Sequence, residues 1–399
     1  MLIEFTIEDG HLYILEARDS DAEKSPLASL LILVNLVKEG ILNQREALLR
    51  IDPTQLAFEK NMPKLGVDNF QQICNWADYF NRMSVCAHAD SCDEVKEAAN
   101  SGADGVTVDL TKTLVEFFKK HRTFYELLNM SKTGAQLSGF EDDLAKEIFK
   151  YFQLFPGRVI KFTLANFSSA IGDDYVKDIN NIVANRTFLV AEIVELQCTS
   201  IRKAQITAFT QNLPIVTPEV IVPCIFTDHE LELILPVIKT KHSDIRVGAS
   251  LSVPRALLRA DAIAAAGIDF IEIDTTSVTQ HIFGFSASDC IMPFYVEKLL
   301  VTEDPFKTLD IRGVGSLIKL AIRKIRKANP LIKIGIAGNH CNDEKSVKFF
   351  DQIKCDYITA NNIVFSKLAA AKSHIQHVQV KEQHEKDEYW TLLENAVLF

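Results

Sequence analysis

Acidic and hydroxyl side chains come together in residues 269–285, DFIEIDTTSVTQHIFGF, in a pattern that could support chemistry. Glu272 and Asp274 alternate with isoleucines, which predicts a short strand carrying both carboxylates on one face. A polar turn, Thr275 to Ser277, follows this strand directly. Because the loop after a strand of a βα unit is the usual position of ligand groups, we expect a binding site here. Asp274 and Glu272 are its candidate metal ligands.

The elements that would position this site form a regular series. From Trp76 onward, short apolar segments alternate with amphipathic helical patterns. Strands that alternate with helices predict a parallel sheet, and a series near eight predicts an α/β fold, a TIM-like (β/α)8 barrel. A doubly wound open sheet is the alternative. The expected strands are 84–88, 105–109, 158–164, 219–223, 245–251, 269–274, 333–337 and 356–359.

The N-terminal part predicts a small appendage of a hairpin and two helices. Residues 2–16 read as two strands joined by a Glu-Asp-Gly turn, and helices are expected over 26–40 and 43–50. A piece of about 55 residues is marginally stable alone, so we expect it to pack on a neighbour. Further along, residues 131–142 predict a surface loop, and the charged segment 374–399 predicts a solvated terminal helix.

Composition limits the classes of partner. The 43 Lys and Arg residues stand against 53 Asp and Glu, a net charge of −10, which disfavours nucleic acid and anionic membranes as partners. The longest apolar run, 27–37, is too short to span a bilayer, and the N-terminus predicts no signal peptide. The eight cysteines are scattered without a CxxC pair, as expected for free thiols in the cytoplasm or another reducing compartment.

Several longer segments of the sequence resemble the pyruvate phosphate dikinases, a group of the phosphoenolpyruvate (PEP)-utilising enzymes. The phrase IEFTIEDGHLYILEAR resembles the end of their ATP-grasp nucleotide-binding domain, and NWADYFNRMSVCAHADSCDEVKEAANSGADG resembles the start of their C-terminal barrel. The similarity continues almost without gaps through two later segments, TQHIFGFSASD and EDPFKTLDIRGVGSLIKLAIRKIRKANPLIKIGIAGNH. The resemblance implies a PEP- and pyruvate-binding barrel.

The resemblance also implies a domain division. Residues 1–56 would be the remnant of the nucleotide-binding domain, 57–75 a linker in place of the phosphohistidine domain, 76–373 the barrel and 374–399 a charged tail. The dikinase reaction needs a histidine that carries phosphate between sites, and the chain has no Thr-Ser-His segment. We therefore expect that this polypeptide alone does not complete the dikinase cycle.

Most of the family's ligand positions carry residues of a different charge. Most of the family's arginines, its metal-binding glutamate and aspartate, and its proton-donating cysteine are replaced, whereas two arginines and one histidine remain. The replaced positions are Leu110, Lys161 and Leu189 for arginines, Ser252 for the glutamate, Thr276 and Ser277 for the Asn-Asp pair, and Ala337 for the cysteine; Arg186, Arg255 and His340 remain.

These replacements share a physical meaning. PEP is a compact polyanion, which guanidinium groups and a divalent cation bind well. A leucine in place of arginine removes both the positive charge and the paired N–H donors of the guanidinium group. Serine hydroxyls are poor replacements for carboxylates as Mg²⁺ ligands. Without the thiol, no obvious acid remains to protonate the enolate carbon. We therefore expect no cofactor, with Mg²⁺ only if a relocated site exists at Asp274 and Glu272.

Two hypotheses of function remain open. The preferred one is a catalytically inactive dikinase-like protein, a pseudoenzyme that acts by protein binding, as a homodimer or with an active homologue, since family members dimerise through this barrel. The alternative is a barrel enzyme or binding protein for a small oxoacid such as pyruvate, PEP or oxaloacetate, by metal-assisted lyase or hydrolase chemistry. Its candidate ligand-binding residues are Lys161, Arg186, Asp274, Glu272 and His340, with His88 and Asp109 expected near the same mouth.

A plainer interpretation of the charged residues competes with both hypotheses. Lys161 could simply neutralise a carboxylate inside an inactive barrel. Likewise, His88, His340 and Cys341 could be satisfied side chains of the fold rather than acids, bases or nucleophiles.

Overall fold

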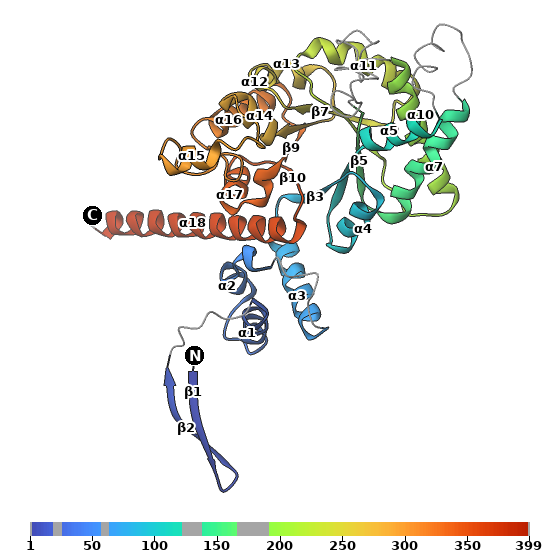
Figure 1. Ribbon diagram of the computed structural model, residues 1–399. Coiled ribbons are helices and arrows are strands. Elements are labelled where there is room, and N and C mark those ends of the chain that lie inside the picture. Colours follow the sequence, from blue (N-terminus) through green and yellow to red (C-terminus); the bar gives the residue numbers. More distant parts are fainter. Residues whose placement is uncertain (1, 19–25, 57–63, 122–137, 166–190, 398–399) are drawn as a thin grey trace. The chain divides into compact units, whose positions relative to one another are not determined.

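The computed structural model describes residues 2–18, 26–56, 64–121, 138–165 and 191–397. The chain divides into two compact units, Met1–Tyr79 and Phe80–Phe399 (Figure 1). Within the described residues, no helix combines the length and apolar character that crossing a membrane requires.

The first unit contains the expected hairpin and helices. The hairpin turns at Asp9 and Gly10, whose φ angles of 52° and 80° are both positive, as tight hairpin turns require. Asn43 and Glu46 form a reciprocal capping box at the start of the second helix. The elements are β1 (Leu2–Glu8), β2 (His11–Arg18), α1 (Pro26–Lys38), α2 (Gln44–Leu49), η1 (Pro53–Leu56) and α3 (Lys64–Phe80).

The second unit is a closed barrel of eight parallel strands, which confirms the TIM-like prediction. The strands pair in the order β10-β3-β4-β5-β6-β7-β8-β9, so no edge is left open. Their bounds agree closely with the expected segments: β3 (Ser84–Ala89), β4 (Gly105–Asp109), β5 (Val159–Thr163), β6 (Glu219–Val222), β7 (Arg246–Leu251), β8 (Phe270–Asp274), β9 (Lys333–Ala337) and β10 (Tyr357–Ala360).

Helices surround the barrel, as Figure 1 shows. They are α4 (Cys92–Asn100), α5 (Leu110–His121), α7 (Ser138–Leu154), α10 (Ala191–Thr210), α11 (Asp228–Lys241), α12 (Pro254–Leu258), α13 (Ala260–Ala265), α14 (Thr275–Phe283), α15 (Met292–Glu297), α16 (Val314–Ala328), η4 (Asn339–Asn342), α17 (Glu344–Gln352) and α18 (Ile363–Val397).

The predicted loop over residues 131–142 is wrong at its C-terminal end. Residues 138–142 already belong to α7, because Phe140 and Leu144 belong to the apolar face that packs on the core; residues 131–137 lie outside the described part of the chain. The terminal helix also begins earlier than position 374. It starts at Ile363, directly after the last barrel strand, and its first turns are buried.

Large and small residues alternate inside the barrel. The rings of Phe270 and Tyr357 lie opposite Gly248 and Gly335, where an added Cβ would come within 2.3 Å and 2.0 Å of those rings. The described apolar core outside the strands packs between the barrel and its helices. The barrel interior is therefore a filled core and not a channel.

Candidate functional site

Asp274, the carboxylate expected to bind a ligand at the barrel mouth, caps a helix. It ends β8 and is the N-cap of α14. Its Oδ1 accepts a hydrogen bond from the Ser277 backbone N–H at 3.1 Å, and its Oδ2 accepts one from the Ser277 hydroxyl at 2.5 Å. Both carboxylate oxygens therefore satisfy the first turn of the helix, whose N–H groups favour a negative charge.

The turns that follow β8 and β9 are bonded to each other. Thr275 Oγ1 lies 2.9 Å from the Ala337 carbonyl oxygen, and the Asn339 backbone N–H donates to Thr276 Oγ1 at 2.9 Å. Between them, Gly338 has a φ of +116°, and a Cβ there would lie only 2.7 Å from Thr276 Oγ1. The two loops are thus in direct contact, at the positions where the resemblance places a metal ligand and a proton donor.

His340 is buried and bonded at both ring nitrogens. Nδ1 lies 2.8 Å from Thr275 Oγ1, and Nε2 lies 2.8 Å from the Pro305 carbonyl oxygen. Burial lowers the pKa of His340. The neutral ring therefore donates from Nε2 to Pro305, and Nδ1 shares the Thr275 hydroxyl proton with the Ala337 carbonyl. This histidine holds three loops together.

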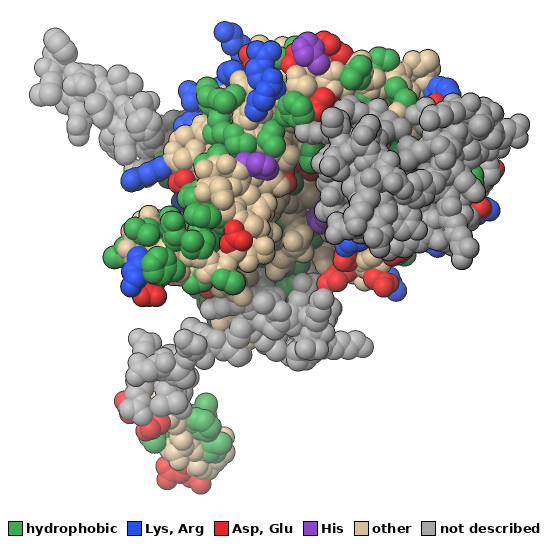
Figure 2. Space-filling model, turned by 45° about the horizontal axis from the view of Figure 1, so that its top comes forward, with side chains coloured by type: hydrophobic (Ala, Val, Ile, Leu, Met, Phe, Trp, Pro, Cys, Tyr) green, Lys and Arg blue, Asp and Glu red, His purple; other side chains and the backbone are tan. Residues whose placement is uncertain are grey.

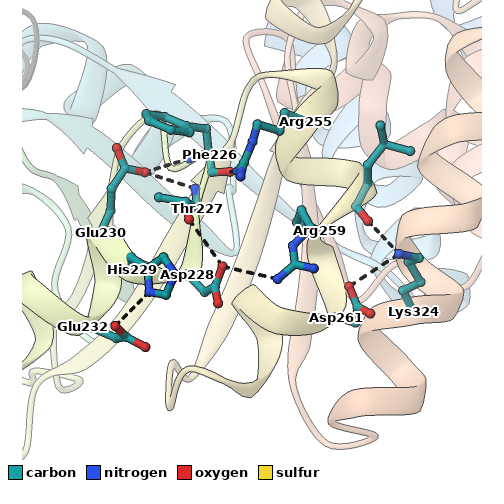
Figure 3. A network of polar contacts seen from close by, with 11 residues as sticks. Phe226, Thr227, Asp228, His229, Glu230, Glu232, Arg255, Arg259, Asp261 and Lys324 are labelled. Carbon is teal, nitrogen blue, oxygen red and sulfur yellow. Dashed lines mark hydrogen bonds and ion pairs between the residues drawn. The ribbon is translucent and has the colours of Figure 1, made fainter.

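The loops after β6 and β7 are tied in a similar way (Figure 3). The Arg255 guanidinium donates to the Phe226 carbonyl oxygen, and its Cζ lies 5.6 Å from the Phe226 ring centroid. Arg259 reaches Asp228 at 3.8 Å. Glu230 accepts from the Phe226 backbone N–H at 2.9 Å and closes the start of α11. Arg255, which the resemblance retains, here joins two neighbouring loops.

A histidine and an aspartate form a pair at the ends of β3 and β4. His88 Nε2 lies 3.1 Å from Asp90 Oδ1, and Lys112 Nζ lies 2.5 Å from Asp90 Oδ2. The hydrogen bond to Asp90 raises the pKa of His88, with smaller contributions from the charges of Asp109 and Glu272. The same contact lowers the pKa of Asp90. The charged form of His88 is therefore more favoured here than it is in a free histidine.

Sequence reasoning named His88 and Asp109 but missed Asp90 and Lys112. Two signals were available. His88 and Asp90 are separated by one residue at a strand end, and Lys112 lies three residues after Asp109 at the end of the next strand. Neighbouring strand ends of a parallel barrel lie side by side.

Lys161 lies inside the barrel, 4% exposed, and not at the mouth. Its Nζ is 3.4 Å from Cys86 Sγ and 3.5 Å from the centroid of the Tyr357 ring. Among the described residues, no carboxylate lies within 4.0 Å of this ammonium, so the expected contact with a carboxylate is not formed. Glu272, on β8, instead accepts a hydrogen bond from Thr359 Oγ1 at 2.9 Å.

In the part of the barrel interior that the structure describes, two buried hydroxyls have no hydrogen-bond partner. They belong to Thr107 and Tyr357, which are 2% and 5% exposed. Burial raises the pKa of the Tyr357 hydroxyl, and the nearby charge of Glu272 raises it further. The interior is thus polar but incompletely satisfied.

The remaining positions from the resemblance are spread over different environments. Leu110 is fully buried in the core between barrel and helices, and Ser252 is buried after β7. Cys341 is also fully buried, which raises the pKa of its thiol well above the usual value. Arg186 and Leu189 lie outside the described residues.

The donor set at the mouth does not fit Mg²⁺. Magnesium takes oxygen ligands in a near-octahedral arrangement. Across the described ranges, no group of three or more His, Cys, Asp or Glu side chains is arranged to hold a metal ion. Asp274 and Glu272, the candidate ligands, already accept hydrogen bonds from Ser277 and Thr359.

A cavity of about 590 Å³ lies beside the mouth, between α4, α5 and α7. Acidic side chains outnumber lysines in its lining, so it does not suit a polyanion. Its lining residues are Asp90, Ser91, Cys92, Lys112, Thr113, Glu116, Asp143, Lys146, Glu147 and Tyr151.

Fold and mouth together define a TIM-like barrel protein with an N-terminal hairpin-and-helix appendage. The sequence model of the PEP-utilising enzyme PEP-binding domain matches residues 64–380. The chain therefore belongs to the PEP-utilising enzyme family.

Its relatives include dikinases from plants and bacteria. It is 27% identical to the chloroplastic pyruvate, phosphate dikinase of Flaveria trinervia over 359 residues and 29% identical to the chloroplastic enzyme of Mesembryanthemum crystallinum over 362. It is 26% identical to the pyruvate, phosphate dikinase of the bacterium Rhizobium meliloti over 370 residues. These matches cover 78%, 78% and 80% of the chain, but only 38%, 38% and 40% of the relatives. The chain thus spans about two fifths of the length of these enzymes.

Among solved structures, the citrate lyase beta subunit from M. tuberculosis, complexed with oxaloacetate and magnesium, matches with 13% identity and a TM-score of 0.38. That match covers 73% of this chain and 99% of the other. Similarity at this level has no bearing on function.

Proposed function

We propose that this chain is a catalytically inactive member of the PEP-utilising family that acts by binding protein, either a second copy of itself or a full-length dikinase homologue. The observation that carries the proposal is that polar groups at the mouth form hydrogen bonds with the protein's own loops. Asp274, His340 and Arg255 each bond to neighbouring loops or to a helix end. A catalytic mouth needs such groups directed at a ligand.

The neutral replacements support the same conclusion. Leu110, Ser252 and Ala337 stand where the resemblance places an arginine, a metal-binding glutamate and a proton-donating cysteine. None of these side chains can supply the charge or the proton that PEP chemistry needs. Restoring one of them alone would not restore the set.

An exposed apolar surface supports a role in protein binding. We define the α15 surface as Ile291, Phe294, Leu299 and Leu300, of which Leu299 and Phe294 are 85% and 51% exposed. Figure 2 shows hydrophobic side chains gathered on this side of the barrel unit, at the left. Leu299 has a φ of +56°, which is a left-handed backbone conformation that residues other than glycine rarely adopt. Exposed apolar clusters of this kind commonly mark protein interfaces.

One observation favours the alternative, a small oxoacid site. His88 faces the mouth with a raised pKa, and Lys161 lies below it in the interior. Two cationic groups could hold a small carboxylate. Asp90, Asp109 and Glu272 surround His88, however, and their negative charges oppose an anion.

Calorimetric titration separates the two functions. We expect no binding of PEP, pyruvate or oxaloacetate at millimolar concentration, with or without Mg²⁺. Mg²⁺-dependent binding that is lost in Asp274→Ala and also in Asp274→Asn would contradict the proposal. Since asparagine keeps the helix cap, the second variant separates loss of a ligand from loss of folding.

Co-expression with a full-length dikinase tests the binding role. We expect mixed or self-associated dimers by light scattering, and Leu299→Asp should weaken association at least tenfold, because it places a charge in an apolar contact. Leu331→Asp is the matched control, since Leu331 is 92% exposed but lies outside the α15 surface. A monomer at micromolar concentration that captures no homologue would exclude this role.

A further inference from the structure

A cysteine and a lysine lie against each other inside the barrel. Cys86 on β3 and Lys161 on β5 are each 4% exposed, and Nζ is 3.4 Å from Sγ. Thr107, on the strand between them, pairs in register with Lys161 and leaves its hydroxyl unbonded. The nitrogen of Lys161 and the sulfur of Cys86 are therefore in direct contact across the strand between them.

The pair lacks the partner that a buried ammonium normally has. Within the described part of the chain, the only contacts recorded for Lys161 Nζ are Cys86 Sγ and the face of the Tyr357 ring. Burial raises the pKa of the Cys86 thiol, while the charge and hydrogen bond of Lys161 oppose that rise. An amine and a thiol are thus adjacent in a site that is closed to bulk water.

We propose that Cys86 and Lys161 form an oxidation-dependent covalent crosslink within the barrel. Hydrogen peroxide is the oxidant: the thiol and one peroxide give a sulfenic acid and water. Lys161 transfers one proton to the sulfenic hydroxyl, and its amine attacks the sulfenic sulfur. An N–S bond forms, the S–O bond breaks, a second water leaves, and the remaining proton of the former ammonium passes to solvent. Sulfur is oxidised by two electrons, and peroxide accepts them.

The site is selective because, among the described residues, Cys86 alone of the buried cysteines has a lysine at hydrogen-bond distance. Cys198, Cys341 and Cys355 are buried in the described structure without a lysine at hydrogen-bond distance from sulfur. Burial raises the pKa of Cys198 to about 12, and no lysine opposes that rise as Lys161 does at Cys86. Cys290, which is exposed, can be oxidised but has no enclosed amine.

The crosslink would join β3 to β5 and remove the interior charge of Lys161. Joining positions 86 and 161 restricts the unfolded chain, as a disulfide does. A thiol reductant would reopen the bond by attack at sulfur and return the amine. We expect a reversible rise of a few degrees in Tm.

Peroxide treatment of the full chain, followed by alkylation, digestion and mass spectrometry, tests the proposal. We expect one linked peptide pair joining Cys86 to Lys161, an intact mass lower by two hydrogen atoms, and reversal by dithiothreitol. Lys161→Arg keeps the charge but lacks a nucleophilic amine, so the link should be lost while Cys290 is still oxidised. Lys161→Met serves if the arginine variant does not fold.

Several outcomes would overturn the crosslink. One is that Cys86 stays reduced under conditions that oxidise Cys290. Another is that Cys86 is oxidised to sulfinic acid without forming a crosslink. A third is that Cys86 links to other lysines at a yield similar to that with Lys161. An unchanged Tm in a chain that is fully linked would overturn the proposed constraint on β3 and β5.

Discussion

Single side chains at the barrel mouth are bonded to their own loops. Asp274 accepts two hydrogen bonds from Ser277, and His340 bonds at both nitrogens. A buried polar group without a partner costs about 1–3 kcal/mol, so these contacts stabilise the loops. The same contacts occupy the atoms that would otherwise face a ligand.

The capping role of Asp274 predicts a specific pair of mutational effects. Asp274→Ala should lower the free energy of unfolding by about 0.5–2 kcal/mol, because the first turn of α14 loses its acceptor. Asp274→Asn should retain most of the stability. Urea denaturation measures both. A neutral effect of the alanine variant would show that the cap contributes nothing.

The burial of His340 predicts a pH dependence. Its pKa is lowered in the folded chain, so the unfolded chain, with a pKa of about 6.5, binds more protons below that pH. The stability that His340 contributes is present above about pH 6.5 and is lost as the pH falls below it. The difference in free energy of unfolding between the native chain and His340→Gln should therefore shrink from about pH 8 to about pH 5. A constant difference would contradict this.

At the scale of elements, large inward-facing side chains on some strands lie against glycines on the neighbouring strands. Gly248 and Gly335 leave room for the rings of Phe270 and Tyr357. Such matching fills the barrel to the density of a protein core. It also fixes Tyr357 beneath Lys161, so the interior polar groups are positioned by apolar packing.

Gly335→Ala should therefore be strongly destabilising. The new Cβ would lie 2.0 Å from the Tyr357 ring, and overpacking of a core costs about 1–3 kcal/mol. Gly105→Ala is the control, because its Cβ would lie 3.0 Å from Cys86 Sγ and should have a smaller effect. Chemical denaturation compares them. Equal effects would show that the ring moves without cost.

For the whole molecule, the two compact units differ in how their apolar residues are covered. The barrel unit closes its own sheet and carries a continuous core. In the hairpin, Phe5, Ile7, Leu12 and Ile14 are all more than half exposed. A two-stranded hairpin is marginally stable in water, so stability should reside in the barrel.

Removal of residues 1–63 should leave the barrel folded. The family match begins at residue 64, and the closed sheet needs no strand from the removed part. We expect a cooperative transition with a Tm within a few degrees of the full chain, measured by differential scanning fluorimetry. Loss of cooperative melting would show that the barrel depends on the appendage.

Much of the fold could be predicted because its signals are local. Strand bounds, the hairpin turn and the N-terminal helix ranges depend on residues a few positions apart. The start of α7 was misplaced, since Gly and Ser residues near position 138 indicate a loop until tertiary packing covers Phe140. The candidate site was less predictable, because the pairing of Asp90 with His88 and Lys112 depends on side-chain directions at neighbouring strand ends.

The sequence by itself determined the barrel, the family resemblance and the missing charges, because each is a property of residue type and order. Only the tertiary structure decided what the remaining polar groups do. Residues 275 and 337, or 86 and 161, are far apart in the chain but adjacent in the barrel. Hydrogen bonds depend on distances of a few tenths of an ångström, which residue order does not encode locally. Hence Asp274, first a candidate metal ligand, is a helix cap, and Lys161 has a thiol beside it.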